Sequence, residues 1–474
     1  MGVLDVWHPD IEEFIDAKQT AGRLTKFNMS VNCNNEFMDR VTKIEELKAT
    51  INELGVRKDA EQIEKLTKKI ENIDKWDLIF PDTQHKNYKK EWNGDIVEWK
   101  NNGYNVKVFK TISVSGLWEK IMNSTYNRNE PGVLFLDVAN KTHGWNYGGT
   151  KAKIAATNPC GEQTLPFGAV CNLASLNLVK FINSDKTGFD LAKVSQSIKV
   201  LVRFLDNIND ITNAPLESYV ESIRNRRRIG CGILGWGSSL YLMKTRFGSD
   251  EAEKIKEQLM KTICYSAIEA SVDLAEEKGM FNGCEPEKHA DIEFFKQIHL
   301  PKELKDRIKK VGIRNSALFS IQPTGNTAVL AENVSSGLEP IFLHEYIRTV
   351  IVPHCPEDIK SITPKYWEGE MKETDMFKWT KEGDEQILKG VAKDGTTYKI
   401  DKNRGLTKEV LCEDYAVHLM KQSNDWNSKS DWAVTTTELS VEEHIKDMMG
   451  FGRWIDSSMS KTRSEEHTSE LQSH

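Results

Sequence analysis

Two neighbouring segments decide how this chain is expected to fold: Asn158-Pro159-Cys160-Gly161-Glu162, and, a few residues later, Cys171-Asn172-Leu173-Ala174-Ser175-Leu176-Asn177-Leu178. In an extended backbone alternate side chains share a face, so Asn158, Cys160 and Glu162 are expected to project together. An amide, a thiol and a carboxylate would then meet in one small volume. The pattern is therefore a candidate for a reactive site.

Pro159 and Gly161 indicate that the first segment forms a loop tip. Both residues are poor helix formers, and Gly161 allows another backbone or a ligand to come close. Taken alone, the Asn-x-Cys pattern is better explained by a buried thiol in a turn beside a helix-capping Asn. The longer sequence around it favours the reactive site.

The run from Asn158 to Leu178, NPCGEQTLPFGAVCNLASLNL, resembles the active-site segment of the ribonucleotide reductase large subunit, and its Asn-Pro-Cys-Gly-Glu-Gln form is most like the class II, adenosylcobalamin-dependent branch. Other segments similar to this family follow one another along most of the chain. Such ordered similarity at separated places is far more specific than one motif. These segments are Gly2–Ile15, which resembles a stretch just beyond a substrate-specificity loop; Gln322–Ala328, the phosphate loop; Ser335–Phe342, the strand after it; and Glu442–Ile445 with Asp456–Thr462, the late barrel.

The resemblance implies an α/β fold, namely a ten-stranded α/β barrel of two parallel half-barrels, incomplete in this chain, with the active-site finger loop inside. Strands that alternate with long helices, such as those expected at residues 187–229 and 251–279, also indicate α/β architecture. We expect barrel segments at residues 1–40 and 76–462. The polar, lysine-rich residues 365–405 show no period and are expected to form an exposed excursion.

Residues 41–75 are expected to form an inserted helical hairpin. Apolar residues recur there with 3-4-3 spacing in two stripes, and Gly55 and Asp59 lie in the break between them. Such a hairpin could dock a partner, but each stripe is narrow and short, so a self-packed surface insertion is favoured. The stripes are Ile44, Leu47, Ile51 and Leu54, then Ile63, Leu66, Ile70 and Ile73.

The loop Pro323-Thr324-Gly325-Asn326-Thr327-Ala328 is a candidate phosphate site. It follows a short buried strand expected at Ala317–Ile321. If a helix begins in the loop, its free amides and the positive end of its dipole would receive a phosphate. An ordinary Pro-Thr-Gly turn would explain the motif alone. Its order after the cysteine motif favours phosphate binding.

Gly230-Cys-Gly-Ile-Leu-Gly235 satisfies the GxGxxG pattern of dinucleotide-binding folds, but its context argues against that function. The glycines follow the charged end of a helix, Arg224–Arg228, and the βαβ setting is missing. Close packing of backbone is the better explanation. The arginines are most simply a solvated helix end, although one of them could face a substrate phosphate.

Composition narrows the remaining classes of protein. The 474 residues are 39% hydrophobic and 28% charged with a net charge of −7, which gives no reason to expect nucleic-acid binding. No stretch approaches the roughly 20 apolar residues of a membrane span, and the first residues do not resemble a signal peptide. Eight cysteines without a CxxC pair favour a reducing cytoplasm and argue against structural zinc. The histidines show no ligand spacing, so no protein metal site is expected.

Both ends of the chain differ from the resembling family. The chain begins where that family already has a long N-terminal portion. Arg463–His474 resembles a translated sequencing adapter, with a natural polar tail as the alternative. We expect this chain by itself to be inactive.

The resemblance implies that a ribonucleotide is reduced to its 2′-deoxy form for DNA synthesis. Cys160 would carry a thiyl radical that removes the 3′ hydrogen, Glu162 would act as general base at the 3′ hydroxyl, and Asn158 would orient the sugar. Cys171 would form a redox disulfide with a cysteine that would precede Met1. Pro159, Gly161 and residues 323–328 would contact substrate.

The same resemblance implies adenosylcobalamin as the radical source, an external dithiol reductant of the thioredoxin or glutaredoxin type, and a possible homodimer. One alternative is a class I large subunit, whose radical arrives from a small subunit through tyrosines beyond Thr462. A class III glycyl-radical enzyme is disfavoured because it lacks the Asn-Pro-Cys-Gly-Glu form. An alternative of a different functional class is a non-catalytic nucleotide-binding or scaffold protein that acts through the helical hairpin.

Overall fold

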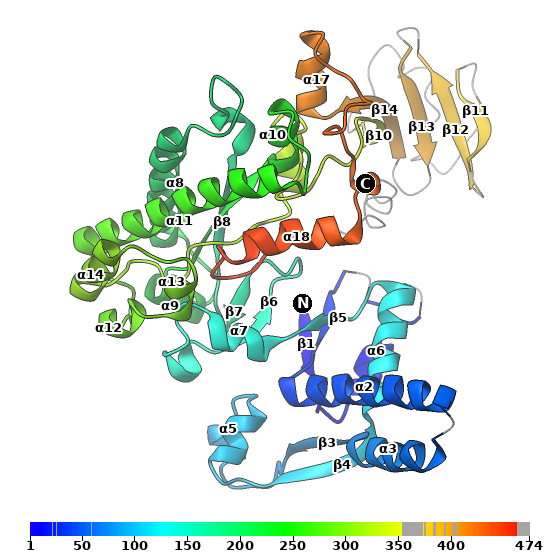
Figure 1. Cartoon of the computed structure of the whole chain (residues 1–474), viewed down its shortest axis with the longest axis vertical. Coiled ribbons are helices and arrows are strands. Elements are labelled where there is room, and N and C mark those ends of the chain that lie inside the picture. The colour runs from blue at the N-terminus through cyan, green and yellow to red at the C-terminus, as the bar shows by residue number, and fades with distance from the viewer. Residues whose placement is uncertain are drawn as a thin grey trace. The chain divides into compact units, whose positions relative to one another are not determined.

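The structure, a computed structural model, describes residues 1–20, 22–24, 26–57, 59–352, 373, 376–382, 385–392, 395–401 and 405–461. The chain divides into two compact units, Met1–Ala169 and Val170–His474 (Figure 1). The segment 463–474, expected to derive from an adapter, and Thr462 of the late-barrel motif lie outside the described residues.

The first unit contains a three-stranded parallel sheet in the order β1 (Gly2–Asp5), β2 (Met29–Asn32) and β5 (Gly132–Leu134). Helix α1 (Ile11–Asp16) follows β1, and α6 (Val114–Arg128) precedes β5. Apolar residues from the strands and helices are fully buried together, because each element presents one apolar face to the sheet. They include Val6, Ile11, Val31, Phe37 and Ile121.

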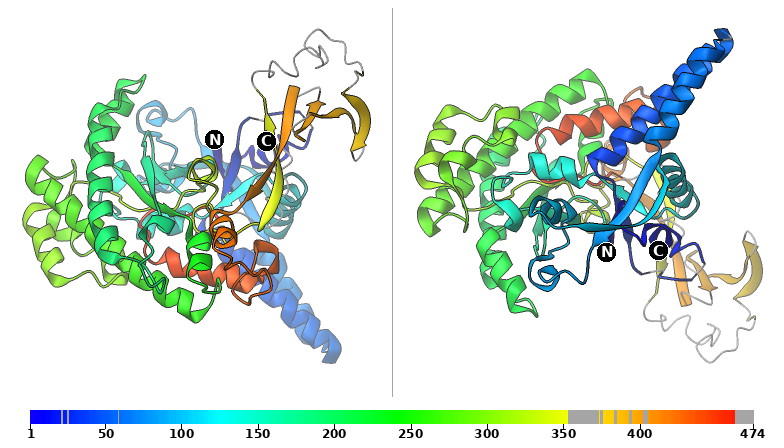
Figure 2. Two further views of the ribbon diagram at one scale, coloured as in Figure 1. Left: turned by 90° about the horizontal axis from the view of Figure 1, so that it is seen from above. Right: turned by 90° about the horizontal axis from the view of Figure 1, so that it is seen from below.

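Two helices, α2 (Asn35–Arg57) and α3 (Ala60–Ile73), run side by side in this unit (Figure 2). Asp59 caps α3 by accepting a hydrogen bond from the amide of Gln62 at 3.2 Å. Ile44 and Leu47 of α2 are buried, whereas no described residue of α3 is fully buried. The base of the hairpin therefore belongs to the core of the unit, while its far end depends on the two apolar stripes.

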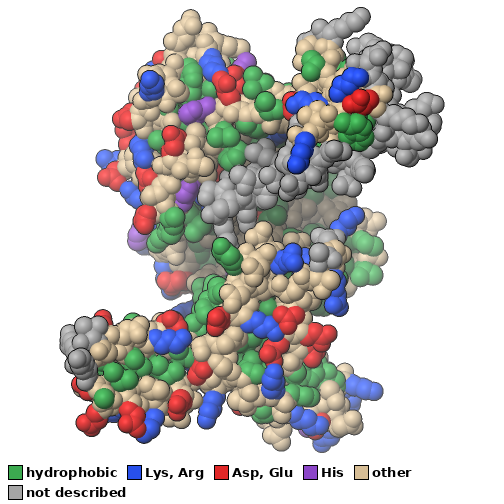
Figure 3. Space-filling model, turned by 90° about the vertical axis from the view of Figure 1, so that its right-hand side faces the viewer, with side chains coloured by type: hydrophobic (Ala, Val, Ile, Leu, Met, Phe, Trp, Pro, Cys, Tyr) green, Lys and Arg blue, Asp and Glu red, His purple; other side chains and the backbone are tan. Residues whose placement is uncertain are grey.

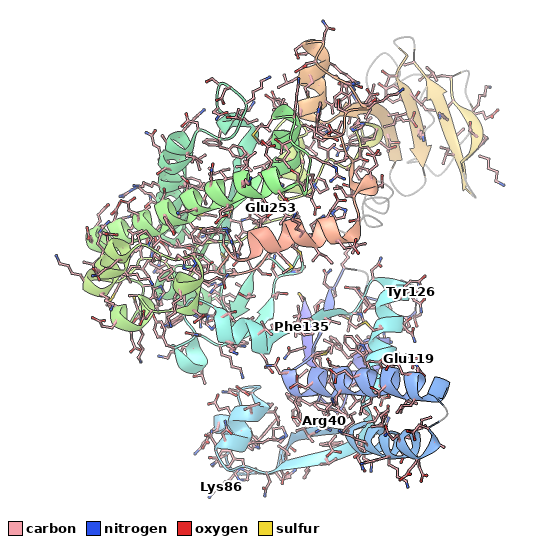
Figure 4. The ribbon with its side chains drawn as sticks, viewed as in Figure 1. Arg40, Lys86, Glu119, Tyr126, Phe135 and Glu253 are labelled. Carbon is pink, nitrogen blue, oxygen red and sulfur yellow. The ribbon has the colours of Figure 1, made fainter. Side chains whose placement is uncertain are left out.

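A two-stranded antiparallel ribbon, β3 (Lys75–Pro81) with β4 (Val106–Ser113), follows the helical hairpin. Arg40 of α2 joins the helix to this ribbon: its guanidinium donates to the carbonyl of Lys75 at 2.5 Å and lies 5.3 Å from the ring centre of Trp76 (Figure 4). The remaining elements are α4 (Tyr88–Glu91), α5 (Ile96–Asn101), α7 (Leu136–Thr142), η1 (Gly149–Lys151), β6 (Ile154–Thr157) and β7 (Thr164–Pro166).

In the second unit β8 (Asn172–Asn177) and β9 (Ile229–Leu234) pair in parallel, with Asn172 opposite Ile229. Parallel bridges extend this pair, from Cys231 to Phe319 and from Ile321 to Met459. The strand expected at Ala317–Ile321 is therefore present as two bridges, and the late-barrel segment lies beside it. Long helices connect these parallel segments, as α/β folds require.

The helices of this unit pack against the parallel segments and one another, with α8 (Leu191–Ile211) lying against α11 (Asp250–Lys278). The predicted helix at 251–279 is confirmed within one residue at each end. Glu253 on α11 (Figure 4) pairs with the buried Lys256, which also reaches Asp447 at 2.7 Å. The others are η2 (Leu178–Phe181), α9 (Glu217–Arg226), α10 (Trp236–Leu242), α12 (Pro286–His289), α13 (Glu293–Gln297), α14 (Lys302–Val311), α15 (Gly325–Leu330), α17 (Tyr415–Gln422), η4 (Thr436–Glu438) and α18 (Val441–Gly452).

A five-stranded antiparallel sheet corrects the expectation for residues 365–405. Its order is β10 (Glu345–Ile351), β14 (Gly405–Glu413), β13 (Thr397–Asp401), β12 (Glu385–Val391) and β11 (Lys378–Glu382). The described part of this segment is not an exposed excursion, because Leu388, Tyr398 and Ile400 are buried in a small apolar cluster. The interspersed lysines hide a two-residue alternation. Residues 365–372 lie outside the described residues.

The mixed α/β class is confirmed, but the described residues do not close a barrel. Closure requires every strand to be paired on both sides, and β1 and β5 each have one neighbour in their sheet. Among the described helices, none is long and apolar enough to cross a membrane.

Gly230 and Gly232 lie in β9, and this explains the GxGxxG pattern. A Cβ atom on Gly232 would lie 2.6 Å from the carbonyl oxygen of Ser320 and would also strike the side chain of Gln322. Only glycine fits such a close approach of backbone. The interpretation as close backbone packing is confirmed.

Candidate functional site

The Asn158–Glu162 motif forms the tip of a hairpin between β6 and β7. The amide of Asn158 donates to the carbonyl of Gln163 at 3.1 Å, and the amide of Gly161 donates to the carbonyl of Asn158 at 3.0 Å. Gly161 has φ +81°, which favours glycine. The expected loop tip is confirmed as a tight turn.

The side chain of Asn158 stabilises this turn. Its Oδ1 accepts a hydrogen bond from the amide of Gln163 at 3.0 Å, so the residue closes the hairpin with both its backbone and its side chain. Asn158 would have to release or share this acceptor to bind a sugar through the same oxygen.

The three polar side chains of the motif differ in burial. Cys160 is exposed, whereas Glu162 is only 3% exposed. The reason is local: the turn at Asn158–Gly161 interrupts the extended backbone on which the alternation rule depends. The described strands close no barrel around the hairpin tip.

Glu162 has the clearest chemical signature of the three. Its Oε2 atom is buried, and among the described residues it has no hydrogen-bond partner. A buried carboxylate oxygen without a partner costs free energy unless a ligand satisfies it. This atom is therefore the best candidate in the hairpin for contact with a substrate hydroxyl.

Cys171, in the second unit, is half-buried and lies one residue before β8. Its thiol donates a weak hydrogen bond to the carbonyl of Asn172 at 3.7 Å.

The expectation of a solvated arginine cluster is correct for Arg224 and wrong for Arg227 and Arg228. Arg224 is exposed, but Arg227 and Arg228 are buried. Arg227 pairs with the buried Asp206 at 2.8 Å and with Asp210 at 2.8 Å. Helix α9 ends at Arg226, so the two following arginines enter the interior with the chain that leads into β9. Partners distant in sequence decide their burial, and no local pattern shows them.

The Pro323–Ala328 loop begins the short helix α15, as expected if the loop presents free amides. The first helical hydrogen bond runs from the amide of Ala328 to the carbonyl of Thr324 at 2.7 Å. The amides of the three residues before Ala328 therefore precede the helical ladder. Gly325, Asn326 and Thr327 are exposed, Pro323 is half-buried and Ala328 is buried.

Buried contacts fix the base of this loop. Thr324, at φ +55°, accepts through Oγ1 from the amide of Gly337 at 2.8 Å. Gln322 donates to the carbonyl of Gly230 at 2.8 Å and accepts from the hydroxyl of Ser175 at 2.9 Å. The loop is thus tied to both parallel strands and to the matched Ser335–Phe342 segment.

Two carboxyls that were not predicted from the sequence support this region: Asp456 is half-buried and Asp414 is buried. Asp456 accepts hydrogen bonds from the amides of Leu318 and Phe319 at 2.8 Å each, and burial raises its pKa to about 6. Asp414 accepts from the hydroxyl of Ser238 at 2.7 Å, and burial raises its pKa to about 7. Asp456 could have been noticed, because it begins the matched late-barrel motif.

The described residues contain no group of three His, Cys, Asp or Glu side chains placed to hold a metal ion. Cys355 lies outside them. On the face shown in Figure 3, lysines and arginines are interspersed with acidic side chains.

The mixed α/β fold carries a cysteine at a hairpin tip and a glycine-containing loop at a helix start. Comparison with protein families identifies the group to which such a fold belongs here: residues 1–472 match the family described as "Ribonucleotide reductase, barrel domain". The chain belongs to this family.

Relatives carry names from two branches of the family. The chain is 27% identical over 466 residues to a vitamin B12-dependent ribonucleoside-diphosphate reductase of Thermoplasma acidophilum, covering 98% of this chain and 46% of the relative. It is 28% identical over 392 residues to a ribonucleoside-diphosphate reductase large subunit of Caenorhabditis elegans, covering 78% and 45%. A vitamin B12-dependent reductase of Mycobacterium tuberculosis is 27% identical over 359 residues, covering 75% and 40%. The chain thus spans less than half the length of these relatives.

Proposed function

We propose that this chain is part of the catalytic barrel of a ribonucleotide reductase, an oxidoreductase that converts ribonucleotides to 2′-deoxyribonucleotides for DNA synthesis. The observation that carries the proposal is the buried, unpartnered Oε2 of Glu162 two residues from an exposed thiol, Cys160, in a chain matched end to end by this family. A general base and a radical thiol at one hairpin tip are the groups that this reaction needs.

The proposed reaction removes the 2′ hydroxyl of the ribose as water. The Cys160 thiyl takes the hydrogen atom from C3′, and Glu162 accepts the proton of the 3′ hydroxyl. The 2′ hydroxyl takes a proton from the thiol pair formed by Cys171 and a second cysteine, and it leaves as water. The pair then delivers a hydrogen atom to C2′ and one further electron to the sugar, and it becomes a disulfide. Glu162 returns its proton to the 3′ oxygen, and Cys160 returns its hydrogen atom to C3′. An external dithiol of the thioredoxin or glutaredoxin type then reduces that disulfide.

Substrate phosphate would bind at Pro323–Ala328. The amides of three exposed residues precede the helical ladder there, and Gly325 leaves open space, since nothing lies within 4 Å of the position of a Cβ atom. Asn158, Pro159 and Gly161 would contact the sugar from the hairpin.

The parallel strands of the two units would belong to one ten-stranded barrel of two half-barrels, in which the hairpin is the inner finger. The proposed segments are residues 1–40 and 76–462 for the barrel and 41–75 for the inserted hairpin. Water must be kept from a radical thiol, so the exposed Cys160 would become covered in the complete enzyme.

Adenosylcobalamin is the proposed cofactor, because two of the relatives are named vitamin B12-dependent. The exposed position of Cys160 fits the approach of so large a group. When bound, the cofactor would supply the radical that converts the thiol to a thiyl. The name of the Caenorhabditis elegans relative supports the second candidate, a class I large subunit that receives its radical from a small subunit. Cleavage of adenosylcobalamin by the complete protein would distinguish the two.

The test compares wild type with Cys160→Ser and Glu162→Gln in the complete protein encoded by the gene, with ribonucleoside diphosphates and triphosphates as substrates. We expect Cys160→Ser to abolish reduction and Glu162→Gln to lower it by at least about a hundredfold, the usual contribution of a general base. Both variants should still bind nucleotide. Turnover by Cys160→Ser would contradict the proposal, and so would unchanged turnover by Glu162→Gln, which a scaffold protein would tolerate.

A further inference from the structure

Strand register places Arg228 beside Cys171. Strands β8 and β9 are parallel, with Asn172 opposite Ile229. Cys171 and Arg228 each come one residue before that pair, so the same register sets them opposite each other at the entry to the two strands. Opposite residues of parallel neighbours point to the same face. The thiol and the guanidinium therefore share one side of the sheet.

Burial makes this proximity electrostatically important. Arg228 is only 3% exposed, and a buried cation requires anionic partners. Burial lowers the pKa of the Arg228 guanidinium, while the charges of Cys171 and Asp456 act in the opposite direction. Asp456 is half-buried, and two backbone amides already donate to its carboxylate. Cys171, likewise half-buried, is the second anionic partner, and its thiol is partly accessible to solvent.

Three other titratable or charged side chains of the described residues lie around Cys171 and Arg228, namely those of Cys231, Cys264 and Arg226. Cys231 lies opposite Ala174, an odd number of positions from Cys171, so its thiol lies on the other face of the sheet. Burial raises the pKa of the thiols of Cys231 and Cys264, which keeps both neutral. Arg226 is a half-buried second cation whose guanidinium donates to Ser222 at 2.9 Å.

We propose that Arg228 is a positioning residue that stabilises the thiolate of Cys171. The inference rests on the proposed function for the redox role of Cys171. A neighbouring cation favours the thiolate, which is the reactive form of cysteine, and a more stable thiolate is a better leaving group. When the thiolate of an external dithiol attacks the other sulfur of the Cys171 disulfide, the S–S bond breaks. Cys171 leaves with the electron pair, and the second thiol of the dithiol then resolves the mixed disulfide.

Alkylation of Cys171 by iodoacetamide across a pH series tests this directly and needs no turnover. Protease cleavage after Glu162 separates the peptides of Cys160 and Cys171, so the exposed Cys160 serves as an internal reference for mass spectrometry. In wild type we expect a midpoint for Cys171 below about 8.5, the ordinary value for cysteine. A midpoint at or above that value would overturn the inference, without any variant.

Two substitutions of Arg228 sharpen the test. Arg228→Gln should raise the midpoint of Cys171 by about one pH unit and slow alkylation at neutral pH by about tenfold. Arg228→Lys should retain most of the wild-type behaviour. Arg226→Gln, a matched loss of a neighbouring arginine, should have little effect, and Cys160 should react equally in all forms. An unchanged Cys171 midpoint in Arg228→Gln would overturn the inference.

If Arg228→Gln does not fold, Asp456→Asn provides a second test. Removal of the competing carboxylate should lower the midpoint of Cys171 further, and an unchanged midpoint would contradict the inference. Failure of the proposed function would give a different result from failure of this inference. The shifts in the alkylation midpoint of Cys171 would then be present while the complete protein reduces no ribonucleotide.

Discussion

The hairpin tip at Asn158–Gln163 and the loop at Gln322–Gly337 are both glycine-containing turns assigned to substrate, but they are held in different ways. Neighbours in sequence hold the hairpin, through one asparagine and one glycine with positive φ. Distant residues hold the loop: Gln322 reaches Ser175 and Gly230, and Thr324 reaches Gly337. The hairpin should therefore tolerate changes elsewhere in the fold, whereas the loop depends on its supporting strands.

Gly232→Ala should have the largest effect, because it breaks the support of the loop. The added methyl group would meet the carbonyl of Ser320 at 2.6 Å and the side chain of Gln322. Overpacking of this kind costs about 3 kcal/mol of unfolding free energy, measurable by denaturant titration. The matched control is Gly325→Ala, since open space surrounds Gly325, and it should change stability by less than about 0.5 kcal/mol. Equal losses of unfolding free energy in the two variants would contradict the difference in packing between Gly232 and Gly325.

The stability of the segment that supports the loop should depend on pH through Asp414. This carboxyl accepts a hydrogen bond from the hydroxyl of Ser238. The same hydroxyl accepts from the amide of Ser335 at 2.7 Å. Burial raises the pKa of Asp414 to about 7, above its unfolded value of about 3.9. Its contribution to stability is therefore fully present below about pH 4 and is lost as pH rises towards 7.

The side chain introduced by Asp414→Asn does not titrate. The unfolding free energy of this variant should therefore rise relative to that of wild type as the pH increases from about 4 to about 7, by at most about 1.4 kcal/mol per pH unit. Denaturant titrations at pH 5 and 8 measure the difference. Asp185→Asn, at an exposed carboxyl outside this network, is the control. A difference between variant and wild type that is constant with pH would show that Asp414 is not held as described.

Asn158→Ala should weaken the hairpin by about 1 kcal/mol, because the amide of Gln163 loses its side-chain acceptor. Faster hydrogen exchange at the Gln163 amide would report the change locally. Asn158→Asp keeps the acceptor and should preserve protection. Loss of protection throughout β8 and β9 would contradict a purely local role.

Thr324→Val should have the smallest effect, about 0.5–1 kcal/mol, because one hydrogen bond from the amide of Gly337 to a half-buried hydroxyl is lost. Thr324→Ser retains the hydroxyl and should remain close to wild type. Exchange at the Gly337 amide distinguishes the two variants. Equal protection in both would show that the hydroxyl does not hold the loop.

The parts predicted well from sequence share a strong local signal. Ile44 and Leu47 repeat at helical spacing, and the helix they mark is present. Residues 251–279 carry the same kind of period and form α11. Pro159 and Gly161 mark a turn with their own backbone preferences. Conversely, the sequence does not indicate the strands within 376–401, because lysines occupy their outward positions.

The candidate site was predicted in its residue types but not in its arrangement. Cys160 and Glu162 differ in burial because a turn, not a strand, joins them. Arg228 reads as part of a basic helix end, yet it is buried next to Cys171. Neither outcome follows from spacing, since both depend on which distant segments pack around these residues.

The sequence by itself determined the turn at Pro159–Gly161, the long helices and, through ordered motifs, the family. These features depend on backbone preferences and periodicities that operate within a few residues. Only the tertiary structure decided which polar groups are buried, and it set Cys171 opposite Arg228. Burial and strand register arise when segments far apart in the chain pack together, and the free-energy cost of an unpaired buried charge then selects the partners.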